Sequence, residues 1–318
     1  MNTIYVCQDA EIIQKVYKTD APVYKKEDLL REPERFSDVE YVFSTWGMPT
    51  LSEDEIAACL PKLKAVFYGA GTVQAFARPF LNRGIKVFSA WAANAVPVAE
   101  YTVAQIVLAN KGFFHTVRYA DWEAARDTYA RLPGNYGVKV GIIGAGMIGK
   151  LVIQALKAYA LEVLVFDPFL ADEKAEELGV TKVELDTLFA ECRVVSNHLA
   201  NNEQTRGMLN GALFEKMPPY ATFLNTGRGA QVVEDELINV LKARPDLTAV
   251  LDVTVAEPPA ADSDFYRLPN CFLTPHIAGS GGNEVQRMGQ YMKEEFARFT
   301  NGEPCLYEVT TEMLKTMA

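Results

Sequence analysis

The composition of the 318-residue chain excludes several classes of protein. Hydrophobic residues make up 49% of it and charged residues 23%, as is typical of a globular protein, and its length corresponds to about two domains. The 31 lysines and arginines against 41 aspartates and glutamates give a net charge of −10. Because affinity for polyanions comes from concentrated positive charge, we expect binding neither to nucleic acids nor to anionic membranes.

The N-terminus and the cysteines predict a cytoplasmic protein. Residues 1–9 have neither the basic start nor the long apolar core of a signal peptide. No uninterrupted apolar run of about 18 residues is found to span a bilayer, since even residues 90–108 contain Asn94, Pro97, Glu100 and Gln105. The five cysteines, odd in number and far apart, are Cys7, Cys59, Cys192, Cys271 and Cys305. We therefore expect mostly buried, reduced thiols rather than disulfides.

The chain alternates between strand-like and helix-like segments, which predicts parallel sheets covered by helices. In the first part, strands are expected at residues 4–7, 39–43, 65–68 and 86–88, and helices after the capping box of Ser52 and Glu55 and at about residues 98–111 and 121–131. Residues 132–137 indicate a loop. In the second part, strands are expected at residues 138–143, 162–166, 194–198, 222–225, 249–253 and 272–274, and a last helix at residues 283–300.

A dinucleotide site is indicated where the strand at residues 138–143 ends. Gly144, Gly146 and Gly149 form the pattern G-x-G-x-x-G between this strand and a helical pattern. The glycines permit a tight turn, the close approach of a pyrophosphate and close packing of the helix, whose N-terminus favours phosphate. Asp167 ends the next strand, 18 residues after Gly149. Because a carboxylate there accepts the ribose hydroxyls and repels a 2′-phosphate, NAD is predicted rather than NADP.

Polar residues that end other expected strands supply candidate chemistry. Histidine is the usual proton donor near neutral pH. His276 lies just past a strand, whereas His198 ends a strand beside the groove and His115 lies in a helical pattern, which favours a structural role. Asp252 and Glu257 share a loop stiffened by prolines after another strand. Arg228 stands between Gly227 and Gly229, and the glycines suggest that something approaches closely.

These stretches resemble the D-isomer-specific 2-hydroxyacid dehydrogenases, the family of D-lactate, D-glycerate and phosphoglycerate dehydrogenases. The matching stretches are residues 144–149, 205–207, 225–229, 251–258, 268–279 and 296–304, and, more loosely, 69–71 and 94–100. The resemblance implies an α/β fold in which a Rossmann dinucleotide-binding domain (residues 100–283) is inserted into a flavodoxin-like substrate domain (residues 1–99 and 284–318). It also implies a homodimer joined through the nucleotide domain, with residues 98–131 as the candidate contact.

The resemblance further implies the roles of single residues in an NAD-dependent interconversion of 2-oxo and D-2-hydroxy acids. His276 is the acid–base and pairs with Glu257, while Arg228 binds the substrate carboxylate and polarises the carbonyl. Ala70, Gly71 and Thr72 complete the carboxylate cradle. The residues expected to bind the cofactor are Gly144, Gly146, Met147, Ile148, Gly149, Asp167, His198, Thr226, Asp252 and His276, of which Asp252 is expected to bind the nicotinamide carboxamide. No metal is expected.

The sequence departs from the family's pattern on the substrate side and in the cofactor groove. Residues 72–74 are Thr-Val-Gln, where a carboxylate often follows Gly71, and residues 199–202 are Leu-Ala-Asn-Asn, where many relatives carry Pro-Leu-Thr. The resemblance thus implies a reaction class and leaves the acid open. Trp46, Tyr68 and Trp91 lie in or near first-domain loops, where packing is the expected role and a substrate wall the alternative.

Two other functions also agree with the sequence. One is an NAD-sensing regulator or corepressor of the same fold, because such proteins can retain Arg228, Glu257 and His276. The other is the oxidation of phosphite or a similar donor on the same scaffold. The intact set of three residues favours the dehydrogenase.

Overall fold

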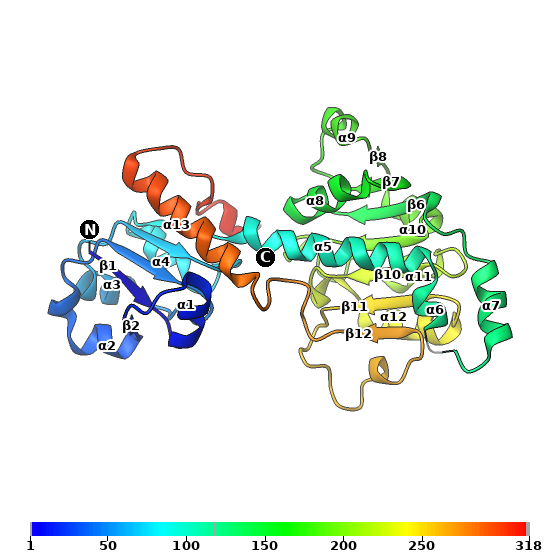
Figure 1. Ribbon diagram of the computed structural model, residues 1–318, viewed down its shortest axis with the longest axis horizontal. Helices are drawn as coiled ribbons and strands as arrows, with labels where there is room; N and C mark the ends of the chain where they lie inside the picture. Colours follow the sequence, from blue (N-terminus) through cyan, green and yellow to red (C-terminus); the bar gives the residue numbers. More distant parts are fainter. Residues whose placement is uncertain (1, 118, 316–318) are drawn as a thin grey trace. The chain divides into compact units, whose positions relative to one another are not determined.

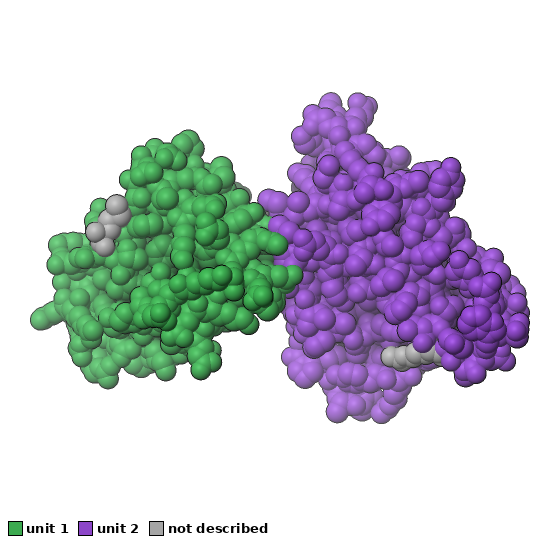
Figure 2. Space-filling view, in the orientation of Figure 1, with its two compact units in different colours: residues 1–94, 280–318 green, residues 95–279 purple. Residues whose placement is uncertain are grey.

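The computed structural model describes residues 2–117 and 119–315. The chain forms two compact units, unit 1 with residues 1–94 and 280–318 and unit 2 with residues 95–279 (Figure 2). The first division falls within the helix α5 (Trp91–Asn110), and both divisions lie a few residues before the predicted ones.

Unit 1 is a parallel sheet with helices on both faces (Figure 1). Its strand order is β2-β1-β3-β4-β5-β13, and only β13 is antiparallel, to β5. This is the flavodoxin-like order with one added edge strand. The strands are β1 (Thr3–Val6), β2 (Val23–Tyr24), β3 (Tyr41–Ser44), β4 (Ala65–Tyr68), β5 (Lys86–Ser89) and β13 (Glu308–Val309). The helices are α1 (Ala10–Tyr17), α2 (Lys26–Arg31), α3 (Glu53–Cys59), α4 (Ala77–Asn82) and α13 (Val285–Asn301).

Two apolar clusters hold the layers of unit 1 together. On one face, Leu29, Ile56 and Phe80 of α2, α3 and α4 pack on the sheet, and on the other, Ile13 of α1 and Met288 of α13 do so. The predicted capping box begins α3, because Ser52 Oγ accepts from the Glu55 amide at 3.2 Å and Glu55 accepts from the Ser52 amide at 2.8 Å.

Unit 2 is a seven-stranded parallel sheet in the order β8-β7-β6-β9-β10-β11-β12, the Rossmann order with one more strand. The strands are β6 (Tyr136–Ile143), β7 (Ala160–Phe166), β8 (Thr181–Lys182), β9 (Val194–Asn197), β10 (Thr222–Asn225), β11 (Thr248–Leu251) and β12 (Cys271–Leu273). The helices that follow α5 are α6 (Phe113–Thr116), α7 (Trp122–Ala130), α8 (Met147–Leu156), α9 (Asp172–Leu178), α10 (Leu185–Glu191), α11 (Gly211–Glu215) and α12 (Glu234–Ala243). Side chains of α5, α8 and α9 fill one face of the core, and those of α10, α11 and α12 the other.

The structure corrects the sequence predictions at the sheet edges and at α5. The two-residue strands β2, β8 and β13 were not expected, because so short an edge strand leaves no periodic pattern. Helix α5 begins at Trp91 rather than near residue 98, and Pro97 lies inside it. It has 20 residues and contains an 18-residue stretch with a mean hydropathy of 1.2, so that length and composition alone would allow it to cross a membrane, contrary to the sequence analysis. Within the protein 56% of this apolar stretch is buried, as is usual for a core helix.

All five cysteines are free. Four are buried and Cys305 is partly buried, in agreement with the predicted mostly buried thiols.

Candidate active site

The predicted cofactor residues gather where the strand order of unit 2 reverses. Gly144 follows β6 and His198 follows the neighbouring strand β9, and ligands of α/β sheets bind at such switch points. Gly144 has a φ of +90°, and a Cβ added there would lie 2.8 Å from the carbonyl oxygen of His198. The turn therefore requires glycine, as the sequence pattern predicted.

The other two glycines of the pattern meet different surroundings. A Cβ at Gly149 would lie 2.0 Å from the carbonyl oxygen of Gly144, whereas a Cβ at Gly146 would meet nothing within 4 Å. Gly146 is the N-cap of α8, without a capping side chain, and Met147 beside it is 45% exposed, while Ile148 is partly buried. The free amides and open space at this helix end fit a dinucleotide pyrophosphate.

Asp167 lies directly after β7 and faces the glycine turn. Its Oδ2 accepts from the amide of Ala145 at 2.7 Å and its Oδ1 from the amide of Phe169 at 2.8 Å. The carboxylate is thus held beside the pyrophosphate-binding turn, which fits the ribose-binding role predicted for it.

His198 and Thr226 lie under the turn, and each is only 9% exposed. Ser196 Oγ lies 2.9 Å from Nε2 of the ring and Thr226 Oγ1 3.5 Å from Nδ1. Burial lowers the pKa of His198 to about 4, so the ring is neutral at pH 7. Their part in cofactor binding stays a prediction.

The loop that carries Arg228 packs on the loop that carries Glu257. A Cβ at Gly229 would lie 2.0 Å from the carbonyl carbon of Thr254, so only glycine allows this approach. Burial lowers the pKa of the Arg228 guanidinium, and the negative charge of Glu257 acts against this shift. The glycine beside the arginine therefore serves the packing of two loops that bring these opposite charges together.

The guanidinium of Arg228 is partly buried, and although the charge of Glu257 acts on it, it forms no ion pair with a described residue. Its one hydrogen bond to a described residue runs from Nη1 to the carbonyl oxygen of Gly227 at 2.7 Å. A desolvated cation that forms no direct ion pair is costly unless an anion joins it. The geometry is therefore suited to hold an anionic ligand.

His276 and Glu257 form a close pair at the carboxyl edge of the same sheet. Nδ1 of His276 lies 2.7 Å from Oε2 of Glu257, and the two side chains are 47% and 40% exposed. Within the described chain, Nε2 of the ring has no hydrogen-bond partner. With Nδ1–H donating to the carboxylate, Nε2 is free to exchange a proton with a ligand.

The backbone of His276 is unusual, since its φ is +54°. Residues other than glycine rarely adopt this left-handed backbone conformation. Those that do occur often at functional sites. Asp252, which is 3% exposed, holds the loop in place. Its Oδ1 accepts from Thr274 Oγ1 at 2.7 Å and from the Ile277 amide at 2.8 Å, and its Oδ2 from the Ala278 amide at 2.9 Å.

The predicted role of Asp252 in binding a carboxamide is not tested by these contacts. They show that both of its carboxylate oxygens already support the histidine loop.

A pocket of about 410 Å³ lies beside the His276–Glu257 pair, and both residues line it together with apolar side chains such as Pro258, Tyr266 and Leu273.

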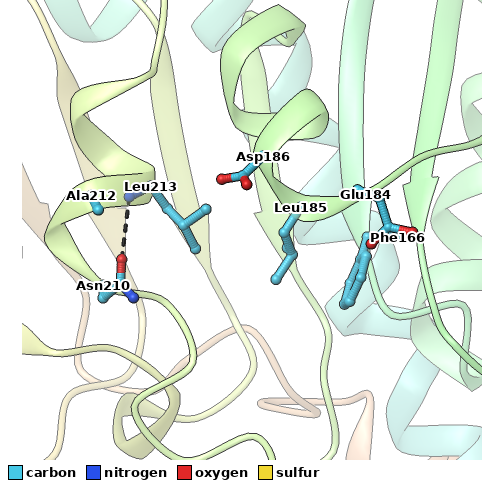
Figure 3. A pocket seen from close by; sticks show the side chains of 7 residues that line it. All are labelled: Phe166, Glu184, Leu185, Asp186, Asn210, Ala212 and Leu213. Carbon is cyan, nitrogen blue, oxygen red and sulfur yellow. Dashed lines mark hydrogen bonds between the residues drawn. The ribbon is translucent and has the colours of Figure 1, made fainter.

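A second pocket in unit 2, of about 450 Å³, lies at the carboxyl end of β7 (Figure 3). It is lined by Phe166, by Glu184, Leu185 and Asp186 at the start of α10, and by Asn210, Ala212 and Leu213 at the start of α11. Two of its lining residues, Glu184 and Asp186, are carboxylates, which disfavour a phosphate there, and the glycine turn stays the predicted pyrophosphate site.

A buried network of side-chain amides, which the sequence analysis missed, underlies the Arg228 loop. Asn197, Asn225 and Gln231 are each at most 1% exposed. Asn197 Nδ2 donates to Oε1 of Gln231 at 2.6 Å and to Oδ1 of Asn225 at 3.0 Å. Gln231 Oε1 also accepts from the Arg228 amide at 3.2 Å, and its Nε2 donates to the carbonyl oxygen of Leu199 at 2.7 Å. The available signals were the asparagines that end the neighbouring strands β9 and β10.

The predicted substrate cradle lies in unit 1, after β4. Ser89 Oγ donates to the carbonyl oxygens of Ala70, at 2.9 Å, and Gly71. A Cβ at Gly71 would meet only Asn94 Nδ2, at 3.8 Å, and Thr72 is exposed. The peptide from Ala70 to Thr72 is thus anchored through its carbonyl groups, and its role in carboxylate binding stays a prediction.

Comparison with known proteins identifies the family. Residues 108–278, more than half of the chain, match the family model described as D-isomer specific 2-hydroxyacid dehydrogenase, NAD binding domain. The chain belongs to this family. The matched region contains the glycine turn, Asp167, Arg228, Glu257 and His276, so the predicted fold and family are confirmed.

Among the curated 2-hydroxyacid dehydrogenases, the D-3-phosphoglycerate dehydrogenase of Archaeoglobus fulgidus is 30% identical over 283 residues, which are 88% of this chain and 52% of the relative. The glyoxylate reductase of Korarchaeum cryptofilum is 28% identical over 94% of this chain and 90% of its own. The chain spans about half the length of the phosphoglycerate dehydrogenases that it matches. The apo structure of Rhodotorula graminis D-mandelate dehydrogenase superposes with a TM-score of 0.77 at 20% identity and covers 98% of both chains, which shows the shared fold.

Proposed function

We propose that the protein is an NAD-dependent oxidoreductase that interconverts small 2-oxo acids and D-2-hydroxy acids. The observation that carries this proposal is the convergence in unit 2 of the His276–Glu257 pair, at 2.7 Å, with the partly buried guanidinium of Arg228, on which the charge of Glu257 acts. This reaction needs a proton-transfer group and an anion-binding group beside the dinucleotide. The carboxyl edge of the unit 2 sheet carries both groups and the glycine turn. The names of its relatives D-3-phosphoglycerate dehydrogenase and glyoxylate reductase agree with this class.

The residues of unit 2 suit NAD. The amides at Gly146 and the N-terminus of α8 would hold the pyrophosphate, and Asp167 the adenosine ribose. Met147, Ile148, His198, Thr226 and Asp252 are the further residues proposed to line the cofactor. When bound, the nicotinamide supplies or accepts the hydride.

The side chains of the protein then bind the substrate and transfer the proton. Arg228 binds the substrate carboxylate through a planar, charge-assisted fork and polarises the carbonyl, and the peptide from Ala70 to Thr72 supports the same carboxylate. His276 gives a proton from Nε2 to the carbonyl oxygen in reduction and takes it from the hydroxyl in oxidation. Glu257 holds the ring by its Nδ1 and balances the charge of the imidazolium.

The proposed assembly is a homodimer joined through unit 2. Residues 98–131 expose apolar side chains in and around α6 and α7, among them Phe113 at 40%, Tyr119 at 56% and Trp122 at 60%. Such exposed apolar surface favours a protein contact.

We also propose a cytoplasmic location, supported by the five free cysteines.

The experiment that tests the activity follows NADH absorbance with pyruvate, glyoxylate, hydroxypyruvate and phenylpyruvate. The expected result is oxidation of NADH with at least one of these acids. If the protein binds NADH, as followed by nicotinamide fluorescence, but oxidises it with none of them, the dehydrogenase proposal fails and a regulator is favoured. A parallel run with NAD and phosphite tests the remaining alternative.

A further inference from the structure

Two neighbouring loops at the carboxyl edge of the unit 2 sheet are joined at two points. They are the Arg228 loop, residues 226–233, and the Glu257 loop, residues 252–259. The first junction is the close packing of Gly229 on Thr254 described above. The second is a hydrogen bond at 2.7 Å, in which the amide of Val255 donates to Oε1 of Glu234. Glu234 directly follows the Arg228 loop as the first residue of α12, so its backbone is fixed by the helix.

The Glu257 loop leaves the core of unit 2 at Val255. Residues 252–254 are buried, whereas Val255 is 61% exposed and residues 256–258 are exposed as well. Side-chain packing therefore does little to hold this stretch. Within the described part of the chain, two hydrogen bonds tie residues 255–257 to other elements, from Val255 to Glu234 and between Glu257 and His276.

The environment of Glu234 is unusual for a carboxylate. It is half-buried, and it forms no ion pair with a described residue. Burial raises the pKa of its carboxyl, and the hydrogen bond from Val255 acts against this shift. The helix end itself does not require this burial, because the exposed Asp235 and Glu236 also place negative charge in the first turn of α12. The contact with Val255 is thus what Glu234 gains from its position.

The group that depends on this contact is Glu257. It pairs with His276 at 2.7 Å, and its charge acts on Arg228. Because the paired side chains are 47% and 40% exposed, water competes for both, and such a pair persists only where both backbones are well fixed. Asp252 fixes the backbone on the histidine side. On the glutamate side, the corresponding support comes from Glu234.

We propose that Glu234 is a positioning residue of the proton-transfer site. By accepting from the Val255 amide, its carboxylate holds Glu257 where it pairs with His276. The effect of Glu234 on turnover rests on the proposed function, whereas its effect on the His276–Glu257 pair does not depend on any substrate.

The kinetic test compares Glu234→Ala, Glu234→Gln and Asp235→Ala in the full-length chain, with NADH and glyoxylate or hydroxypyruvate. Because Val255 is exposed, water can replace the lost acceptor and Glu234→Ala should fold, as checked by urea unfolding. A catalytic group displaced by about 1 Å can lose about a hundredfold in rate, so we expect kcat to fall roughly ten- to a hundredfold, with NADH affinity nearly unchanged.

Two matched variants show whether this loss comes from the Val255 contact. Glu234→Gln keeps an oxygen that accepts from the Val255 amide and should restore most of kcat. Asp235→Ala removes the neighbouring, exposed carboxylate of the same helical turn and should leave kcat unchanged. Equal losses in Glu234→Ala and Asp235→Ala would overturn the inference.

A double-mutant cycle shows whether Glu234 acts through Glu257. In a Glu257→Gln background, Glu234→Ala should lower kcat by less than about twofold, because the group that it positions has already been changed. The same loss in this background as in the wild type would show general damage to the site and would overturn the inference.

Proton NMR separates this inference from the proposed function. The Nδ1 proton that His276 shares with the Glu257 carboxylate gives a downfield imidazole resonance, which is assigned by its loss in His276→Asn. It should broaden or move upfield in Glu234→Ala and stay in place in Asp235→Ala. An unchanged resonance in Glu234→Ala overturns the inference, whether or not any oxo acid is reduced. If the resonance responds as expected but no acid is reduced, the proposed function fails and the positioning role stands.

Discussion

Asp252 supports His276 through both its backbone and its side chain. The carbonyl oxygen of Asp252 accepts from the His276 amide at 3.0 Å, and its buried carboxylate accepts from the amides of Ile277 and Ala278. The strand end at β11 thus fixes the loop that holds the imidazole in a left-handed backbone conformation. The position of the imidazole therefore depends on the buried Asp252 carboxylate behind its loop.

Asp252→Asn is therefore expected to weaken the site by loosening this loop. The amide nitrogen that replaces one oxygen cannot accept, so a buried donor among Thr274, Ile277 and Ala278 loses its partner, at a cost of about 1–3 kcal/mol in the free energy of unfolding. Urea unfolding and kcat measure the two effects. Thr274→Val, which removes a single donor, is the milder control, and an unchanged kcat in Asp252→Asn would contradict the role.

His276→Asn is expected to lower kcat by about 10²–10⁴-fold, the usual contribution of a general acid–base. Asparagine tolerates the left-handed conformation better than most residues, so the backbone at φ +54° should be retained and the thermal midpoint should change little. Steady-state reduction of a 2-oxo acid measures kcat. The control is His115→Asn, in α6, which should keep the activity as long as it folds.

Arg228→Lys tests the planar fork while it keeps the charge. Oriented charged donors at a developing oxyanion contribute about 3–4 kcal/mol, and lysine cannot form the bidentate contact. We expect kcat/KM for the oxo acid to fall at least about a hundredfold, with NADH affinity nearly unchanged. The exposed Arg267, changed to Lys in the same way, is the matched control. A loss of NADH affinity of the same size would show that the arginine serves the cofactor instead.

Gln231→Leu breaks the buried amide network below the Arg228 loop. Asn197 and the Arg228 amide lose an acceptor, and the carbonyl oxygen of Leu199 loses a donor. The expected cost is about 1–3 kcal/mol in unfolding free energy for each unsatisfied buried group, together with a raised KM for the oxo acid. Denaturant unfolding and KM are measured side by side. The double variant Asn197→Leu/Gln231→Leu should recover part of the stability, because it removes donor and acceptor together.

The pH dependence of stability should carry a contribution from His198. Burial lowers its pKa to about 4 from 6.5, so above pH 6.5 neither the folded nor the unfolded state is protonated there. As the pH falls from 6.5 toward 4, only the unfolded chain takes up the proton, and the fold loses up to about 3 kcal/mol. His198→Gln should lose less stability than the wild type over this interval, as measured by urea unfolding at pH 7 and pH 5. An identical decline in both proteins would contradict a buried, neutral His198.

The strands of both sheet interiors and the glycine turn were predicted from the sequence because their signals are local. Each of these signals is contained in a short stretch of sequence. They are a β-rich run before G-x-G-x-x-G, an aspartate at the end of the next strand, and the helical spacing of apolar residues. The two-residue strands at the sheet edges and the start of α5 at Trp91 were missed, because edge pairing and helix packing depend on partners distant in the chain.

For the candidate site, residue types and strand ends were readable in the sequence, whereas distances and environments were decided by the tertiary structure. The sequence by itself determined that Arg228, Glu257 and His276 each follow a strand or its loop, since parallel strands present their carboxyl ends at one edge. Only the fold joined Glu257 to His276, brought the charge of Glu257 to bear on Arg228, placed Asp252 under the histidine loop and buried Gln231 beside Asn197. Hydrogen bonds and desolvation depend on three-dimensional proximity between residues far apart in the chain, and a linear pattern does not specify that proximity.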